Sequence, residues 1–462
     1  MAVHYYKPEK KGTTNQGFIT PIGCFEALPN DDLRHKIDVL IRTQPLLAPV
    51  FHSAEVKIAN FFVPTRLLWD KWEDFITGGP DGTDASVPPY FDLTGKPPGV
   101  GSLHDFLGVP PDCEDPKTSA LPFRAYNMIY NEYFRDQDLI DPVAMSTGSG
   151  EDLTTNTDLL RAAWMKDYFT SARPDTQKGD DVEISLTGDA PVYGDGAAGG
   201  TSTLAVEDNT GTQRELRTYN GNMFVQMSGV TSANPLIDLK ADLSNVSAIS
   251  VNDLRLATAL QRYKENMLRF GSRYVERLQQ AFGARNLDAR LDRPEILSTG
   301  RNVIQFSEII QSAPSINDTS DESVGTLKGH GINVTHSNNY RRRIPEYGFV
   351  ISLMIIRPRT AYQQGLPKMF SRTTKEEYFQ PELQHIGMQA ILNKELKASH
   401  ATPDGIFGYQ QRYDEYRYMF DQVCGEFRDT LDFWHMGRKF ATDPALNGDF
   451  VTCKGRMYRQ GS

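Results

Sequence analysis

The hydrophobic and polar positions of this chain follow no single period, because strand-like and helix-like segments alternate irregularly along it. Residues 54–63, with the sequence AEVKIANFFV, show the period-2 pattern of a half-buried strand and stop at Pro64. Further strands are predicted at residues 182–186, 302–310, 331–336 and 348–356. A βαβ protein would instead space its strands regularly, with helices between them. The pattern therefore predicts an antiparallel β core with large excursions between its strands.

The excursions carry the predicted helices, at residues 66–76, 123–134, 250–282 and 382–396. The first places its apolar residues on one side and ends at Gly78-Gly79, a helix stop signal. The longest begins at Ser250, whose spacing from Asp253 fits a capping box. Its apolar stripe recurs near every 3.6 residues and is interrupted at Gly271.

Between residues 175 and 247 the composition shifts to Gly, Thr, Asp, Asn and Ser, which predicts an exposed insertion with little apolar surface to bury. Its stretch GDGAAG, residues 194–199, matches the dinucleotide-binding pattern G-x-G-x-x-G. That pattern binds phosphate only between a strand and the start of a helix. Pro191 breaks the preceding strand, and residues 200–204 lack helical apolar spacing. We therefore interpret the stretch as a loop.

The bulk composition fits a globular protein, with 39% hydrophobic and 10% aromatic residues among 462. The longest apolar run, residues 349–356, has the length of a strand and not of a membrane span. The polar N-terminus lacks an apolar segment, so no secretory signal is expected. The four cysteines are far apart and form no C-x-x-C, which favours reduced thiols over disulfides or zinc.

The best candidate for enzyme chemistry is the acidic and histidine-containing set Glu426, Asp429, Asp432 and His435. On a helix, each step of three residues rotates by about 300°, so the first and last members point to opposite sides. Four such ligands do not converge on one metal ion. Because the chain also lacks the common catalytic motifs, we predict no catalytic residue, no metal site and no cofactor.

The net charge of −10 argues against affinity for nucleic acid that is spread over the whole surface. Two local stretches could still contact it, Tyr340–Arg343 and residues 454–459. Arginine next to an aromatic residue suits single strands, since the guanidinium holds phosphate while the ring stacks on a base. The alternative is that these arginines lie in a solvated loop or in salt bridges between subunits.

Long loops rich in proline and aromatic residues are the most unusual feature, as in residues 86–111 and 357–370. Interfaces favour Tyr, Phe, Met and Arg, and prolines stiffen a loop and so reduce the entropy lost on association. We predict that these loops lie mainly at contacts between copies of the chain.

Four segments closely resemble the major capsid protein of Microviridae, the small tailless single-stranded-DNA bacteriophages, and its gokushovirus-like branch in particular. They are NFFVPTRLLWDKWEDFITGG (60–79), PFRAYNMIYNEYFRDQDLIDPV (122–143), GSRYVERLQQAFGARNLDARLDRPEIL (271–297) and FGYQQRYDEYRYMFDQVCGEFRDTLDFWHMGR (407–438). Residues 163–179 fit the same pattern. The resemblance runs in order from about residue 15 to residue 440.

The resemblance implies a mainly β, eight-stranded viral jelly roll with long loop and helical insertions. It implies an N-terminal arm at residues 1–19 and one capsid domain at 20–462, with a variable surface-loop region at 188–247. The expected assembly is a T=1 icosahedral shell of 60 copies around a circular single-stranded DNA genome, built in the cytoplasm of a bacterial host. The alternative is a carbohydrate-binding or carbohydrate-cleaving jelly-roll protein, since that fold also serves lectins and glycosidases.

The resemblance also implies further partners. These are a small basic DNA-packaging protein, internal scaffolding or pilot proteins, and a host surface receptor that the sequence does not identify. Because the subunit is acidic, we expect its charge to be polarised, with a few basic and aromatic groups turned toward the genome. The predicted DNA-facing residues are Tyr5, Tyr6, Lys7, Lys10, Lys11, Arg341, Arg342 and Arg343.

Overall fold

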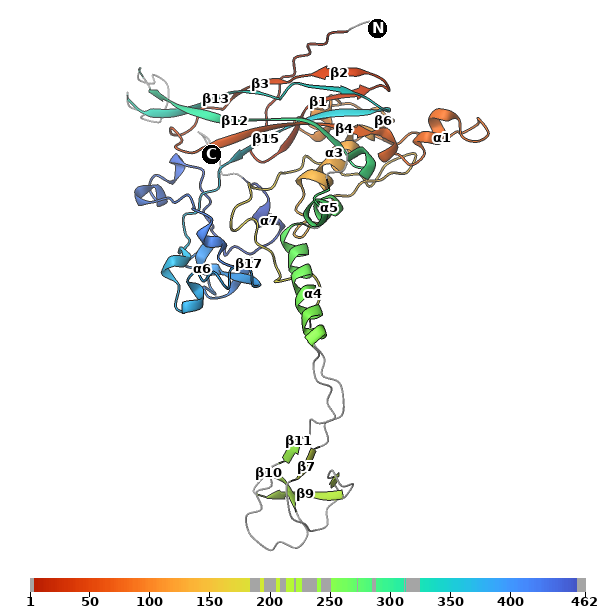
Figure 1. Cartoon of the computed structure of the whole chain (residues 1–462). Helices are drawn as coiled ribbons and strands as arrows, with labels where there is room; N and C mark the ends of the chain where they lie inside the picture. The colour runs from red at the N-terminus through yellow and green to blue at the C-terminus, as the bar shows by residue number, and fades with distance from the viewer. Residues whose placement is uncertain are drawn as a thin grey trace. The chain divides into compact units, whose positions relative to one another are not determined.

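The computed structural model describes residues 4–182, 192–194, 205–207, 213–219, 222–226, 239–241, 251–271, 273–284, 288–310, 312 and 325–454. The chain divides into two compact units, one formed by residues 1–176 with 267–462 and the other by residues 177–266. Antiparallel β structure dominates the first unit (Figure 1). No helix in the ranges described is both long and apolar enough to cross a membrane.

Six strands form the main sheet of the first unit, in the antiparallel order β1-β15-β4-β12-β13-β3. They are β1 (Ile19–Ala27), β3 (Asp38–Arg42), β4 (Ala54–Pro64), β12 (Glu295–Ile310), β13 (Leu327–His336) and β15 (Gly348–Pro358). The strands predicted at 54–63, 302–310, 331–336 and 348–356 are confirmed, and residues 183–186 of the remaining one lie outside the described residues. β12 is longer than predicted because residues 295–304 pair with β4 and residues 305–310 with β13.

One face of the central strands β4 and β15 is covered by helix α3 (Leu121–Ile129). Phe61 of β4 and Ile351 of β15 belong to one buried cluster with Phe123 and Tyr126 of the helix. The Tyr126 hydroxyl donates a hydrogen bond of 2.8 Å to the carbonyl of Ile19 in β1, so the buried polar group is satisfied. This packing anchors the excursion between β4 and β12 to the sheet.

The main sheet is curled, so that its other face encloses a second buried cluster. Val56 and Ile58 of β4 share a second buried cluster with Ile304 of β12 and Met354 of β15, and Val39 of the end strand β3 packs against it. A separate antiparallel pair, β2 (Asp32–His35) with β14 (Tyr340–Arg343), packs on the sheet through Leu33. The six strands and this pair form a mainly β architecture compatible with the predicted jelly roll.

The helix predictions have mixed outcomes. The helix at 123–134 is confirmed as α3, which continues as a π-helical turn over Tyr130–Phe134. The long helix is confirmed as α4 (Val251–Arg269) and α5 (Tyr274–Phe282), separated near Gly271, which has a φ of 104°. Residues 66–76 form a 3-10 turn and then the short α1 (Trp72–Thr77), which ends at Gly78 in the left-handed region.

The helix predicted at residues 382–396 is wrong. The structure has β16 (Met388–Leu392), which pairs with β17 (Ile406–Gln411), followed by a single turn, α6 (Asn393–Leu396). Gly387 has a φ of 68°, which ends any helix before residue 388. Cross-strand pairing with β17 then outweighs the weak helical spacing of the apolar residues.

The remaining elements of the first unit are short. They are β5 (Tyr90–Phe91), α2 (Leu103–Leu107), β6 (Thr118–Ser119), α7 (Gly448–Val451) and 3-10 turns at Thr65–Leu67, Asp288–Leu291, Lys368–Phe370, Lys375–Glu377, Asp414–Tyr416, Gly425–Arg428 and Asp432–Trp434.

The second unit carries two small antiparallel sheets, β10-β9-β8 and β11-β7. Their strands are β7 (Val192–Gly194), β8 (Ala205–Glu207), β9 (Gln213–Tyr219), β10 (Asn222–Gln226) and β11 (Leu239–Ala241). Most of the predicted insertion, including residues 195–199 of the glycine stretch, lies outside the described residues.

Candidate interaction surfaces

The arginines Arg341, Arg342 and Arg343 lie on strand β14, which pairs with β2 in a register that places Arg341 opposite Arg34. Successive residues of a strand point to opposite faces. Arg341, Arg343 and Arg34 are exposed, whereas Arg342 is half-buried. The pairing therefore gathers three arginines on one exposed face, which we call the basic face. Asp32 and Asn30 also belong to it.

Electrostatics leave the basic face positive. Arg341 binds Asp32 with two hydrogen bonds from Nε, at 2.8 and 3.0 Å, and Arg343 donates to Asn30 Oδ1 at 2.7 Å. The hydrogen bond from Arg341, together with the positive charges of Arg34 and Arg343, holds the pKa of Asp32 below its usual range. Three guanidinium groups face one carboxylate here, so positive charge is in excess.

Arg342 points the other way and has a structural partner. Its guanidinium forms an ion pair of 2.9 Å with Glu295 at the start of β12. This contact ties the β2–β14 pair to the main sheet. Arg341 and Arg342 thus both form ion pairs within the subunit, and salt bridges between subunits stay a prediction.

Among the predicted DNA-facing residues of the N-terminal arm, some are likewise exposed and one has a structural partner. Tyr5 and Tyr6 are 86% and 83% exposed, and Lys7 and Lys11 are exposed as well. Lys10 instead turns its ammonium group onto the body, where it donates to the carbonyl of Pro21 at 3.1 Å and also to that of Phe106. Burial of that ammonium lowers the pKa of Lys10. Lys10 therefore fastens the arm to β1 and α2.

Sequence reasoning missed Arg34, the third arginine of the basic face. It is an isolated basic residue in the stretch PNDDLRHKID, where two aspartates precede it. Only the pairing of β2 with β14, about 300 residues along the chain, places it beside Arg341. The exposed position of Arg34 on β2 is seen only in the structure, so the local sequence carried no signal for it.

The acidic and histidine set at residues 426–435 does not form a metal centre. Glu426 and Asp432 lie on two separate 3-10 turns, and Asp429 and His435 directly follow these turns. Both ring nitrogens of His435 are used: Nε2 donates to the carbonyl of Phe427 at 2.7 Å, and Nδ1 accepts from the amide of Gly437 at 2.9 Å. Asp432 is paired with Lys439 at 3.1 Å. In the described part of the chain, no three His, Cys, Asp or Glu residues are grouped to hold a metal ion.

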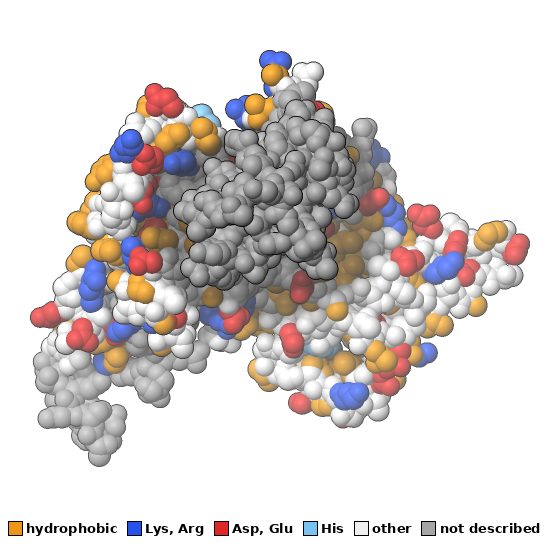
Figure 2. Space-filling model, turned by 90° about the horizontal axis from the view of Figure 1, so that it is seen from below, with side chains coloured by type: hydrophobic (Ala, Val, Ile, Leu, Met, Phe, Trp, Pro, Cys, Tyr) orange, Lys and Arg blue, Asp and Glu red, His pale blue; other side chains and the backbone are white. Residues whose placement is uncertain are grey.

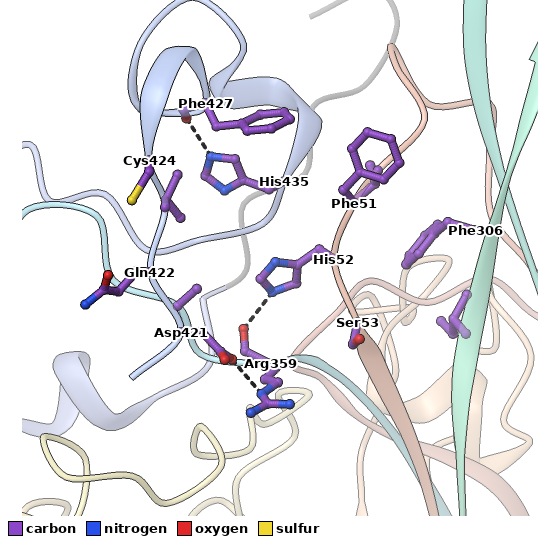
Figure 3. A pocket seen from close by; sticks show the side chains of 14 residues that line it. Phe51, His52, Ser53, Phe306, Arg359, Asp421, Gln422, Cys424, Phe427 and His435 are labelled. Carbon is purple, nitrogen blue, oxygen red and sulfur yellow. Dashed lines mark hydrogen bonds and ion pairs between the residues drawn. The ribbon is translucent and has the colours of Figure 1, made fainter. Parts of the chain in front are cut away.

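A cavity of about 500 Å³ lies beside His435, lined by residues of the β3–β4 connection, β12 and the C-terminal segment (Figure 3). His52 projects into it and donates from Nε2 to the carbonyl of Arg359 at 2.7 Å. Burial lowers the pKa of His52, which favours the neutral ring. The Arg359 side chain pairs with Asp421 at 2.6 Å. Each polar group named here has a structural partner.

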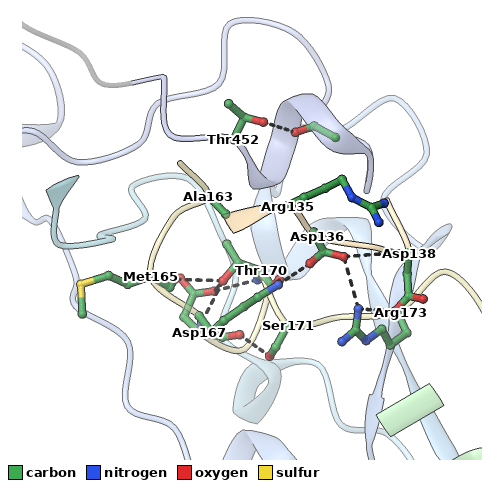
Figure 4. Close-up of polar contacts among 12 residues, drawn as sticks. Arg135, Asp136, Asp138, Ala163, Met165, Asp167, Thr170, Ser171, Arg173 and Thr452 are labelled. Atoms are coloured by element: carbon green, nitrogen blue, oxygen red, sulfur yellow. Dashed lines mark hydrogen bonds and ion pairs between the residues drawn. The ribbon is translucent and has the colours of Figure 1, made fainter. Parts of the chain in front are cut away.

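An ionic network stiffens an excursion that has little regular secondary structure (Figure 4). The buried carboxylate of Asp136 lies 2.5 Å from Lys166 Nζ and 3.5 Å from Arg173, which also pairs with Asp138 at 2.7 Å. Burial alone would raise the pKa of Asp136, but the two cations outweigh it and the pKa is lowered. The network joins the turn after α3 to residues 166–173.

The loops predicted to lie at subunit contacts also contribute side chains to the interior of the subunit. Phe91, Phe106 and Tyr362 are buried within the chain. Val100 and Phe370, at 87% and 67% exposure, remain open for contact with other chains. That the exposed residues of these loops lie at contacts between copies of the chain therefore stays a prediction. On the described surface seen in Figure 2, acidic and basic side chains are interspersed with apolar ones.

The described part of the chain thus combines a curled antiparallel sheet, loops held by ion pairs and an exposed basic face. Comparison with known proteins gives the family. The model of the family "Capsid protein (F protein)" matches residues 6–459, so the chain belongs to this capsid protein family. It is a structural, non-enzymatic capsid protein of the Microviridae and part of the phage virion.

Three relatives named capsid protein VP1 resemble the chain over most of its length. The protein of Bdellovibrio phage phiMH2K is 37% identical over 94% of this chain and 84% of its own length. The protein of Chlamydia phage 1 is 31% identical, with 96% and 87% covered. The protein of Spiroplasma virus 4 is 30% identical, with 95% and 85% covered. The capsid interpretation is thereby confirmed over the carbohydrate-binding alternative.

Proposed function

We propose that 60 copies of this chain assemble into a T=1 icosahedral shell that encloses a circular single-stranded DNA genome. The match of residues 6–459 to the capsid family is the observation that carries this proposal. In it, residues 1–19 act as an arm and residues 20–462 as one jelly-roll domain with large insertions. Residues 188–247 form a variable outward-facing region, where a host receptor would bind.

The basic face is the part of the subunit that we assign to the genome. Its exposed guanidinium groups, from Arg34, Arg341 and Arg343, are suited to phosphate, and Tyr5 and Tyr6 of the arm are suited to stacking on bases. Lys7 and Lys11 add charge to the same arm. Such contacts address the backbone and the faces of bases, so little sequence specificity is expected.

Most of the charge of the genome must be neutralised by another molecule, because the subunit itself carries −10. A small basic packaging protein would supply the missing cations inside the shell. Internal scaffolding or pilot proteins would complete the set of partners during assembly.

Electron microscopy of the purified chain, or of particles from infected cells, tests the shell directly. The expected result is closed particles with 60 subunits. Soluble monomers that bind saccharides and form no shell under any assembly condition would contradict the proposal.

Salt-dependent binding of single-stranded DNA by the unassembled subunit tests the basic face. Replacing Arg34, Arg341 and Arg343 together by Gln should weaken binding and reduce the slope of log K against log salt by about 0.7 for each phosphate that is no longer neutralised. Arg359→Gln is the matched control, since it removes another exposed arginine that is also paired with an aspartate. Equal slopes for the triple variant and the wild type would refute the assignment.

A further inference from the structure

Strand β3 lies at one end of the six-stranded sheet, with β13 on one side and no strand on the other among the residues described. Its sequence is Asp38-Val39-Leu40-Ile41-Arg42. Val39 and Ile41 turn toward the buried cluster inside the curl, whereas Asp38, Leu40 and Arg42 are exposed. Figure 1 shows β3 along the outer margin of the sheet.

The hydrogen bonds at both ends of β3 show which of its backbone groups are unused. Just before it, the carbonyl of Ile37 accepts from the amide of Ser337 at 2.8 Å, and just after it the amide of Thr43 donates to Gly331 at 2.9 Å. In an antiparallel pair, the residues bonded to the partner alternate with residues whose N–H and C=O point away. Residues 38, 40 and 42 therefore present their backbone groups at the open edge.

Proteins commonly protect an open sheet edge with charged residues that disfavour pairing with another strand. The side chains of β3 instead include an exposed apolar residue. Leu40, at the centre of β3, is 64% exposed. It lies opposite Val334, which is 49% exposed, and Ile332 is its exposed neighbour on β13. At one end of the strand stands Asp38, whose exposed carboxylate pairs with Lys36 at 2.8 Å and with His336 of β13 and would gain a further cation from a second copy; at the other end stands the exposed Arg42. An edge strand with an apolar centre and opposite charges at its two ends is suited to pairing with a strand of complementary pattern.

This arrangement is self-complementary. If two copies of β3 run antiparallel with Leu40 opposite Leu40, each Asp38 lies opposite an Arg42 and every outward backbone group meets a partner. A parallel pairing in register would instead place Asp38 against Asp38. The antiparallel arrangement exchanges both hydrogen bonds at three residue pairs, so about six backbone bonds form.

We propose that β3 pairs edge to edge with β3 of a second copy of this chain across a twofold axis, which joins two main sheets into one. The inference rests on the proposed icosahedral shell, since such a shell places every subunit beside a twofold axis. Opposite charges and paired apolar side chains fix the register at Leu40. The same contact covers an edge that would otherwise promote aggregation.

A cysteine at the axis tests the register. Bonded antiparallel pairs have Cα atoms about 5.5 Å apart, within the roughly 4.4–6.8 Å that a disulfide spans. In a Cys424→Ser background, which removes the exposed native thiol, Leu40→Cys should give a disulfide-linked dimer from oxidised particles. Arg42→Cys is the control, because the two copies of residue 42 would lie about 14 Å apart. Equal yields of dimer at both positions would overturn the proposal.

A proline at the same position tests the backbone bonds. Leu40→Pro removes an outward N–H without removing a bond to β13, so unassembled subunits should unfold at the temperature of the matched Leu40→Thr control. Loss of two interfacial hydrogen bonds and insertion of the ring should reduce shell yield by at least about tenfold relative to that control. Equal shell yields for the two variants would overturn the proposal.

The two proposals fail in different ways. If wild-type chains form no shell, the T=1 assembly is wrong, but a dimer of Leu40→Cys in solution would still support pairing through β3. If shells form and Leu40→Cys gives no more dimer than Arg42→Cys, the edge pairing is wrong and the shell proposal stands.

Discussion

The ion pair between Arg124 and Asp152 should be indispensable to the subunit. Arg124 lies on α3, and the side chains of the pair are 1% and 0% exposed. Its Nε donates to Asp152 Oδ2 at 2.8 Å, while the other guanidinium nitrogens donate to the carbonyls of Leu68 at 2.8 Å and Gly148 at 3.0 Å. One side chain thus joins α3 to the segments around Leu68 and around residues 148–152 of the same excursion.

Arg124→Met removes all of these donors and leaves the carboxylate of Asp152 buried without its cation. Removing one member of a buried pair costs about 3–5 kcal/mol, because the remaining charge stays out of water. Total stabilities of domains are about 5–15 kcal/mol, so the variant should lose a large fraction of its free energy of unfolding. Asp152→Asn in the same chain should recover part of the loss, since it removes the isolated charge and keeps an acceptor for the amide of Thr155.

Urea unfolding of unassembled subunits at pH 7 measures this difference. The matched control is Lys71→Met, which breaks the pair of Lys71 with Asp74, whose side chains are 57% and 44% exposed. Exposed pairs contribute about 0–1 kcal/mol, so the control should unfold near the wild-type midpoint. A loss below about 1 kcal/mol for Arg124→Met would refute the reasoning. If the variant yields no soluble subunit, recovery of soluble protein in the double variant becomes the readout.

Three further outcomes are expected. The pKa values of Asp136 and Asp152 are lowered in the folded state, although burial alone would raise them. The stability that the two carboxylates contribute is therefore complete above their unfolded pKa of about 3.9. It is lost as pH falls through the lower folded pKa values. Acid titration of unfolding should show the decrease, and a stability independent of pH down to about 3 would contradict it. Gly300→Ala places a Cβ 2.1 Å from the carbonyl of His336, so the strands must separate and the unfolding midpoint should fall; an unchanged midpoint would exclude the close approach. Lys10→Met should release the N-terminal arm, which limited proteolysis of unassembled subunits would detect as faster cleavage before residue 19 than in a Lys7→Met control.

Local pattern was sufficient where a segment has one strongly preferred partner. The β15 strand reads as a continuous apolar run because nearly all of its residues are buried, and such a run has few alternatives to a central strand. The helical stripe of residues 250–282 was recognisable for a similar reason, and the glycine that interrupts it ends α4 in the structure. Family resemblance then indicated the function, which no single motif in the chain identifies.

Contacts between distant segments were beyond local pattern. Residues 388–392 carry weak helical spacing, yet they form a strand because β17 offers hydrogen bonds and a packing surface. Arg342 reads like its two neighbours in the sequence, but strand alternation turns it to Glu295 and leaves the others exposed.

The sequence by itself determined the β character of the chain, its principal helices and its place among capsid proteins, because these follow from apolar periodicity and from long segments of unusual composition. Only the tertiary structure decided which charges stand together. Arg34 joins Arg341 through a strand pairing about 300 residues apart, and β3 becomes an edge only because the sheet ends there. The physical reason is that pairing across a sheet depends on register between strands, and register is a property of the folded chain.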